Sequence, residues 1–281
     1  MFGFWAYGFM RHALAAALLV SIACGIVGTF VVVRRIVFIS GGISHAAFGG
    51  VGLGYWLGIH PLVAVVPFSL VVAVAIGLVH RRLRLSEDAA IGVLWTMGMA
   101  LGVLFVRLAP GYTPDLQSYL FGNILTVPGF DLALMAAVDA LIVAAVALFC
   151  REFAAISFDE EFASVVGVRV QPIGLLLLAL VALSVVVLIR VVGVILVMAL
   201  LTMPAAIARQ LTNGLFRMIL AAIAVSVAVT VAGLWLSYSL DLASGATIVL
   251  LLGTVLLAVS AVRQAMGRRA GEKGDVENGE A

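Results

Sequence analysis

Long apolar runs, broken only by short polar segments, constrain this chain more than any other feature. A membrane-spanning helix needs about 20 mostly apolar residues, and 64% of the sequence is hydrophobic against 11% charged. The pattern therefore predicts an all-α polytopic membrane protein with eight or nine transmembrane helices. The run at 43–58 is short, and Arg190 alone interrupts the segment 172–208, so both counts stay open. The apolar runs lie near 12–33, 43–58, 61–79, 89–108, 131–150, 172–189, 191–208, 218–238 and 245–262.

The distribution of Lys and Arg orients these spans, because the cytoplasmic loops of membrane proteins collect basic residues. With nine spans and the amino terminus outside, all but three of the 16 Lys and Arg residues fall on the cytoplasmic side. The three exceptions are Arg11, Arg107 and Arg190. We therefore expect the loops near 34–42, 80–88, 151–171 and 209–217 to be cytoplasmic, together with the tail.

One membrane domain, residues 1–263, accounts for most of the chain, and a disordered cytoplasmic tail is expected at 264–281. Gly, Glu and Lys dominate that tail, which has almost nothing to bury. The first ten residues lack a basic region, so the first run is interpreted as a retained span and not a removable signal. Cys24 and Cys150 both lie within spans, which makes a disulfide framework or a cysteine metal site unexpected.

A histidine inside the second apolar run is the main candidate for function. His45 follows Gly41-Gly42 and precedes Gly49 and Gly52, and it is interpreted as the only histidine within a span. An ionisable side chain at membrane depth is costly and normally faces a partner or a water-filled cavity. If a helix restarts after Gly42, a ring nitrogen lies beside a groove without side chains. The alternative is that the glycines allow close helix packing and that the imidazole bonds to a neighbouring carbonyl.

An acidic residue in the middle of the fifth run is the second candidate. An unpaired carboxylate at the position of Asp139 would cost about 2.5–3.5 kcal/mol on insertion scales. It should line the same cavity as His45, pair with a buried donor, or be protonated. Carboxylate and imidazole together suit zinc, manganese or iron(II) as a ligand set.

Two loops have compositions that indicate more than a linker. In the cytoplasmic loop after the fifth span, Ser157 or Asp159 can cap a short helix, acids occupy its first turn, and Gly167 ends it. Its apolar edge, which includes Phe158, Phe162, Val165 and Val166, predicts either a protein partner or a position on the inner leaflet. The outer loop near 109–130 mixes turn residues with aromatics, which suits a docking surface for an external partner or a tightly packed connector.

Six stretches, in order along the chain, resemble a known family: Gly28 to Arg35 with Ser44-His45-Ala46, Glu87 to Gly92, Ser118 to Asn123, Asp159 to Gly167, Val192 to Arg209, and Ser237 to Val249. On these stretches, from about Ala13 to Val262, the chain is similar to the membrane permease of ATP-binding-cassette importers for zinc, manganese or iron.

The resemblance implies a type II importer-like permease in the cytoplasmic (inner) membrane that forms a homodimeric pore. It also implies two cytoplasmic ATPase subunits and an extracytoplasmic metal-binding protein as partners. The helix at about 158–167 would then be the coupling helix that inserts into the ATPase. Its expected coupling residues are Asp159, Glu160, Glu161, Phe162 and Gly167.

One departure from the family pattern concerns the metal pathway. The family commonly has an acid four residues before the histidine, where it helps to bind the ion in transit, and here that position is Gly41. His45 therefore carries over as a pathway ligand without its usual partner. Either another carboxylate, such as Asp139, supplies the charge or passage relies on a weaker site.

The remaining classes of function lack their own signals. No Gly-rich loop ending in Gly-Lys-Ser/Thr occurs, so this subunit is a transport permease and ATP hydrolysis belongs to a separate subunit. An ion-coupled secondary transporter would often show an internal repeat, and none is evident. Ser44 and His45 are adjacent and project about 100° apart on a helix, so they do not form a catalytic dyad. No haem, flavin or nucleotide is expected on this chain, whose divalent metal is cargo.

Overall fold

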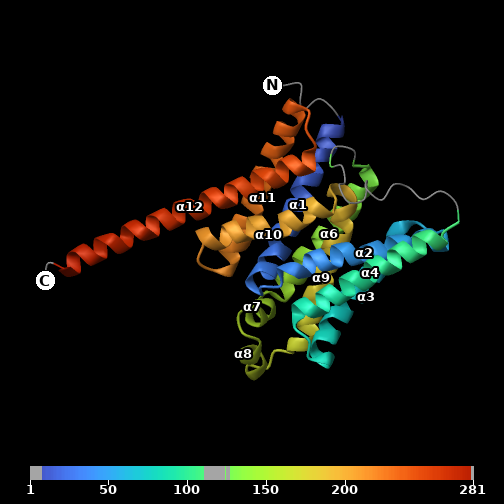
Figure 1. The fold of residues 1–281 in the computed structure, drawn as a ribbon, viewed down its shortest axis with the longest axis horizontal. Coiled ribbons are helices and arrows are strands. Elements are labelled where there is room, and N and C mark those ends of the chain that lie inside the picture. The colour runs from blue at the N-terminus through green and yellow to red at the C-terminus, as the bar shows by residue number, and fades with distance from the viewer. Residues whose placement is uncertain (1–7, 111–123, 125–126, 280–281) are drawn as a thin grey trace.

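The computed structural model describes residues 8–110, 124 and 127–279, and Figure 1 shows these residues as a bundle of helices. The amino-terminal half contains α1 (Gly8–Val33), α2 (Val37–Leu57), α3 (Pro61–Leu83), α4 (Glu87–Leu108) and α6 (Gly129–Leu148). Two short helices follow, α7 (Cys150–Phe158) and α8 (Glu160–Val165). The chain continues with α9 (Val170–Val192), α10 (Val194–Leu211), α11 (Leu215–Leu240) and α12 (Ser244–Gly279).

Nine of the helices in the described part of the chain are long and apolar enough to cross a membrane. They are α1 to α4, α6 and α9 to α12, and each coincides with one of the apolar runs. The predicted all-α, multi-pass fold is confirmed, with nine spans as the upper of the two expected counts. The two helices too short to span, α7 and α8, fall between the fifth and sixth spans.

A glycine, and not the arginine, separates the sixth span from the seventh. α9 continues past Arg190 to Val192, and Gly193 then takes φ +81° before α10 begins. That left-handed conformation suits a residue without a Cβ, and it interrupts the helix. A charged side chain alone does not break a helix, because arginine is a good helix former. This is why the position of the break differs from the one that the sequence pattern suggested.

α2 also differs from its expected form, because it does not restart after the glycine pair. The helix begins at Val37 and continues through Gly41 and Gly42 to Leu57. Close neighbours explain these glycines, since a Cβ at position 41 would lie 2.8 Å from Met198 Cε and one at position 42 would collide with Ile91. The glycine pair therefore admits neighbouring side chains to the helix surface and does not end the helix.

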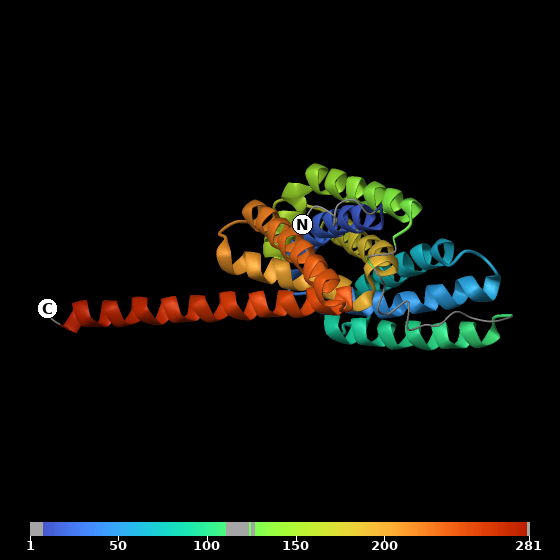
Figure 2. The same ribbon diagram turned by 90° about the horizontal axis from the view of Figure 1, so that it is seen from above.

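Close contact between backbones holds α2 against α4, and Figure 2 shows α2, α3 and α4 side by side in one part of the bundle. A Cβ on Gly49 would lie 2.8 Å from the Gly98 carbonyl oxygen, and a Cβ on Gly52 would lie 2.5 Å from that of Gly102. In return, a Cβ on Gly98 would lie 2.7 Å from the Ala46 Cα. Small residues on both helices thus let the two backbones approach, as is common where lipid surrounds a bundle.

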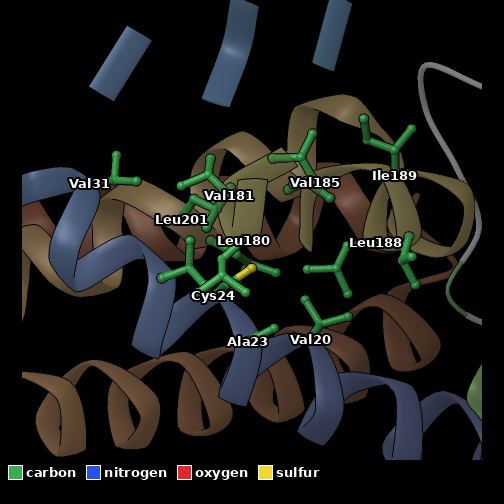
Figure 3. Close-up of a cluster of buried hydrophobic side chains, with 14 of the residues drawn as sticks. Val20, Ala23, Cys24, Val31, Leu180, Val181, Val185, Leu188, Ile189 and Leu201 are labelled. Carbon is green, nitrogen blue, oxygen red and sulfur yellow. The ribbon is translucent and has the colours of Figure 1, made fainter. Parts of the chain in front are cut away.

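The main apolar core lies where α1 meets α9 and α10. Figure 3 shows Cys24 of α1 among Leu180, Val181 and Val185 of α9, with Leu201 of α10 nearby. Cys24 is fully buried and unbonded to another cysteine, as a small hydrophobe would be. The expected tight packing of the first span is also present, because a Cβ on Gly25 would lie 2.8 Å from the Ile223 amide nitrogen.

Polar contacts tie the outer ends of the helices together. The Asp131 carboxylate at the start of α6 is 4% exposed and lies 3.4 Å from the Arg190 Nε near the end of α9. His12 lies inside α1, and its Nδ1 is 3.1 Å from the Val127 carbonyl oxygen. His45 is therefore not the only histidine within a span, as the sequence interpretation had it. The Val127 carbonyl oxygen provides a hydrogen-bond partner for the His12 ring inside the span.

Two expectations from the sequence stay predictions, the disordered tail and the docking role of the outer loop. α12 is assigned through Gly279 and extends away from the bundle in Figure 1, and the expected disorder from Gln264 stays a prediction. The outer loop and its Ser118 to Asn123 motif lie mostly outside the described residues, so the docking interpretation stays a prediction.

Substituting one glycine of the α2–α4 contact should lower stability. Gly52→Ala places a methyl group against the Gly102 backbone and should cost about 1–3 kcal/mol. Gly253→Ala on α12 is the matched control, since no atom lies within 4 Å of its Cβ position. Thermal unfolding in detergent should show a lower Tm for the first variant only. Equal Tm values for the two variants would contradict the packing argument.

Candidate metal pathway and coupling surface

His45 lies on α2 with its ring stacked on an aromatic residue of α4. The ring centroids of His45 and Trp95 are 4.5 Å apart and the planes differ by 3°. His45 is half-buried, and no hydrogen bond to its ring is found within the described residues. The expected bond to a neighbouring carbonyl is therefore not present there. Stacking fixes the plane of the ring and leaves its edge, where the ligating nitrogens lie, unblocked by Trp95.

The glycines beside His45 do not form an open groove in this chain. Gly49 and Gly52 face Gly98 and Gly102 of α4, at distances that exclude even a methyl group. The interpretation of these glycines as the wall of a lumen is wrong, and the packing alternative is correct for them. The physical reason is that the space left by the missing glycine side chain can be filled by the backbone of a neighbouring helix.

The position that usually holds the family's acid is next to a thioether. Met198 of α10 approaches Gly41, which lies one helical turn before His45. An acidic side chain at position 41 would first have to displace the end of Met198, which is flexible. The Met198 Sδ lies 3.7 Å from the Cβ position of residue 41, and nothing in the sequence pattern indicates this neighbour.

Asp139 lies on α6, buried at 6% exposure, and neither carboxylate oxygen has a hydrogen-bond partner among the described residues. α6 packs mainly against α1 and α9, whereas α2 packs mainly against α3 and α4. The structure does not bring His45 and Asp139 together as a ligand pair. Within the described residues, no group of three or more His, Cys, Asp or Glu could hold a metal ion.

The cytoplasmic loop forms two short helices instead of one at 158–167. α7 ends at Phe158, and Asp159 then caps α8 by accepting a hydrogen bond from the Phe162 amide at 2.9 Å. Glu160 and Glu161 occupy the first turn of α8, where their negative charges interact favourably with the helix dipole. Gly167, at φ +91°, turns the chain toward α9. Asp159 is thus the cap, while Ser157 bonds the Phe153 carbonyl at 2.6 Å.

A patch of large apolar side chains surrounds α8 at the end of the bundle. We name these four residues the coupling surface: Phe158 is 72% exposed, Phe162 62%, Val165 86% and Val166 64%. Figure 1 shows α7 and α8 at the margin of the bundle. Phe162 and Val165 lie on α8, while Phe158 ends α7 and Val166 follows α8. Four neighbouring exposed apolar side chains on and beside a short capped helix indicate an interaction surface.

An ion pair connects this surface to the helix of His45. The Arg34 guanidinium, in the turn between α1 and α2, bonds to the Glu160 carboxylate of α8. Arg34 is 10% exposed and Glu160 is 42% exposed, so the contact is partly shielded from water. The sequence places Arg34 in the Gly28 to Arg35 stretch and in a cytoplasmic loop, but nothing in a single sequence links it to a residue 126 positions away.

Comparison with known proteins agrees with this architecture. The profile of the ABC 3 transport family matches residues 6–263. The chain belongs to the ABC 3 transport family. As an ABC 3 protein it is a multi-pass transport permease and not an enzyme, and the family resemblance drawn from the sequence is confirmed.

Three similar proteins illustrate the match of this ABC 3 permease. An uncharacterised membrane protein of Synechocystis sp. is 46% identical over 258 residues, covering 92% of each chain. The manganese transport system membrane protein MntC of Listeria innocua is 36% identical over 248 residues, covering 88% of each. The solved structure of PsaBC from Streptococcus pneumoniae in complex with Fab has a TM-score of 0.80 and 33% identity, and 92% of each chain is covered.

Breaking the ion pair of this ABC 3 permease should loosen α8. Arg34→Gln removes a contact worth about 1 kcal/mol, discounted for the exposed carboxylate, and so should raise amide hydrogen exchange in α8 about fivefold. Charge reversal in Arg34→Glu with Glu160→Arg should restore most of the protection, as a double-mutant cycle detects. Arg169→Gln, an exposed arginine beside α8, is the control. Unchanged exchange in Arg34→Gln would show that the pair does not hold α8.

Proposed function

We propose that this chain is the permease subunit of an ATP-driven importer for a divalent transition metal, with manganese as the leading cargo and zinc or iron(II) as competitors. The observation that carries the proposal is the coupling surface, four large apolar side chains left exposed at the cytoplasmic end of the bundle. A secondary transporter does not need a surface that binds an ATPase. A permease driven by a separate ATPase subunit needs one.

The cargo is inferred from chemistry and from relatives. His45 provides a neutral nitrogen ligand in a helix that is otherwise apolar or small, and imidazole suits several divalent transition metals. The name of the Listeria relative supports manganese among them. Transit also requires weak binding, because the carrier has to release the ion. One imidazole without the usual acid at position 41 is consistent with a weak site.

The assembly completes this proposal. We infer a homodimeric pore, two cytoplasmic ATPase subunits on the coupling surfaces, and an extracytoplasmic metal-binding protein at the outer loops. In this arrangement two copies of His45 lie on one pathway, which compensates for the single ligand in each chain. Asp139 is retained as a second pathway candidate, since its unpartnered carboxylate is unusual at membrane depth.

The metal pathway is tested by uptake of manganese into vesicles that contain the full complex, with zinc and iron(II) as competitors. His45→Ala should lower uptake by at least about tenfold without loss of ATPase co-purification, because the substitution removes a metal ligand and leaves the fold unchanged. His60→Ala, at the outer turn before α3, should leave uptake unchanged. His45→Asp should restore part of the uptake with a preference for manganese over zinc.

Two results separate the candidates. Normal uptake in His45→Ala would remove His45 from the pathway. Normal uptake in Asp139→Asn, with His45→Ala still defective, would return Asp139 to a structural role.

The coupling surface is tested by polar substitution. Phe162→Ser with Val165→Ser should leave the permease folded in the membrane, because both side chains are already exposed, and should abolish ATPase co-purification and uptake together. Leu250→Ser with Leu257→Ser, two exposed apolar positions on α12, is the control. Co-purification and uptake that survive in the first variant would refute the coupling assignment.

A further inference from the structure

A basic cavity adjoins the coupling surface, where α1, α7 and α10 end and α11 begins. It has a volume of about 420 Å³, and the residues that line it include three arginines, Arg34, Arg35 and Arg209. No acidic residue is among the described residues that line it. Such a concentration of one charge in a concave site favours an anion.

The three arginines differ in whether an acidic side chain neutralises their charge. Arg34 pairs with Glu160, outside the lining of the cavity. Among the described residues, the Arg209 side chain makes one hydrogen bond, which Nη1 donates to the Val32 carbonyl oxygen at 3.4 Å. Arg35 has no side-chain partner within the described residues. Two guanidinium groups in one cavity are therefore left without a counter-charge.

The cavity also has an apolar side, formed at the ends of membrane-spanning helices. Val33 is the last residue of α1, and Leu215 and Met218 lie in the first turn of α11, so the wall follows the cytoplasmic ends of spans. Phe158 of the coupling surface also lines the cavity, so an acidic segment of a protein bound there is the competing occupant. A phospholipid already has its phosphate at this level and its acyl chains beside the apolar wall.

We propose that this cavity binds the phosphate of an anionic phospholipid of the inner leaflet, with Arg35 and Arg209 as its ligands. Guanidinium groups bind phosphate through charge-assisted, bidentate hydrogen bonds. Basic pockets between spans on the cytoplasmic side are the kind of site that holds anionic headgroups. The proposal concerns lipid and is independent of which metal the permease transports.

Backbone geometry supplies test variants that should not unfold the protein. Arg35 has φ +63° and Arg84, at the cytoplasmic end of α3, has φ +54°; both are left-handed conformations that glycine adopts more easily. Arg35→Gly with Arg209→Gln removes the two free charges of the cavity. Arg84→Gly with Arg217→Gln removes the same charge from exposed cytoplasmic positions outside the cavity, and relieves an equivalent backbone conformation.

The measurement is the amount of phosphatidylglycerol retained by the full-length permease after transfer from mixed phosphatidylglycerol and phosphatidylcholine vesicles, by native mass spectrometry. The cavity variant should retain about thirtyfold less phosphatidylglycerol than the wild type, and the control variant should match the wild type. Soluble glycerol 3-phosphate at equal concentration should not replace the lipid, because it lacks the acyl chains.

Three outcomes overturn the proposal. Equal retention by the wild type and the cavity variant would show that the arginines do not hold lipid. Equal losses in the cavity and control variants would show a general effect of surface charge. Unchanged lipid retention with loss of ATPase co-purification in the cavity variant would assign the cavity to an acidic segment of the ATPase.

Discussion

The approach of α2 to α4 through facing glycines is the contact on which the rest of the arrangement depends. A Cβ on Gly52 would lie 2.5 Å from the backbone of α4, so the two helices meet at a distance that side chains would prevent. Lipid is as apolar as a leucine side chain, and association of spans therefore relies on close packing more than on the hydrophobic effect. This contact places Trp95 against His45 and thereby sets the orientation of the one imidazole proposed for the pathway.

Ion pairs at both ends of the bundle connect its elements, whereas one carboxylate in the middle of a span has no partner among the described residues. Asp131 and Arg190 form an ion pair at the outer side, and Arg34 and Glu160 form one at the inner side. Asp139 differs, with two buried oxygens that have no partner in the described part of the chain. The cost of such a group at membrane depth makes an unpartnered carboxylate worth testing even though it does not meet His45.

The sequence was sufficient for the order of the spans, for their number to within the choice of eight or nine, and for a helix beginning near Asp159, because these depend on local composition and on caps. It was insufficient for the division of the loop after the fifth span into α7 and α8. It was insufficient for long-range neighbours. The approach of Met198 to Gly41, the stacking of Trp95 and the Arg34–Glu160 pair each join residues from different helices. Whether a glycine ends a helix or lies within one was ambiguous for the same reason, since Gly193 lies between two helices while Gly41 and Gly42 lie inside one. The role of a glycine depends on the residues that pack against it.

The short turn between α1 and α2 connects the proposed sites of this permease. Arg34 holds α8 and the coupling surface, Arg35 faces the basic cavity, and α2 begins two residues later with His45 two helical turns into it. A displacement of α8 by an ATPase would therefore act through Arg34 on the start of the helix that bears the pathway histidine. Lipid bound by Arg35 would act on the same turn. Because the turn is short and α2 is rigidly packed on α4, its movement is expected to be transmitted along α2 and not absorbed locally.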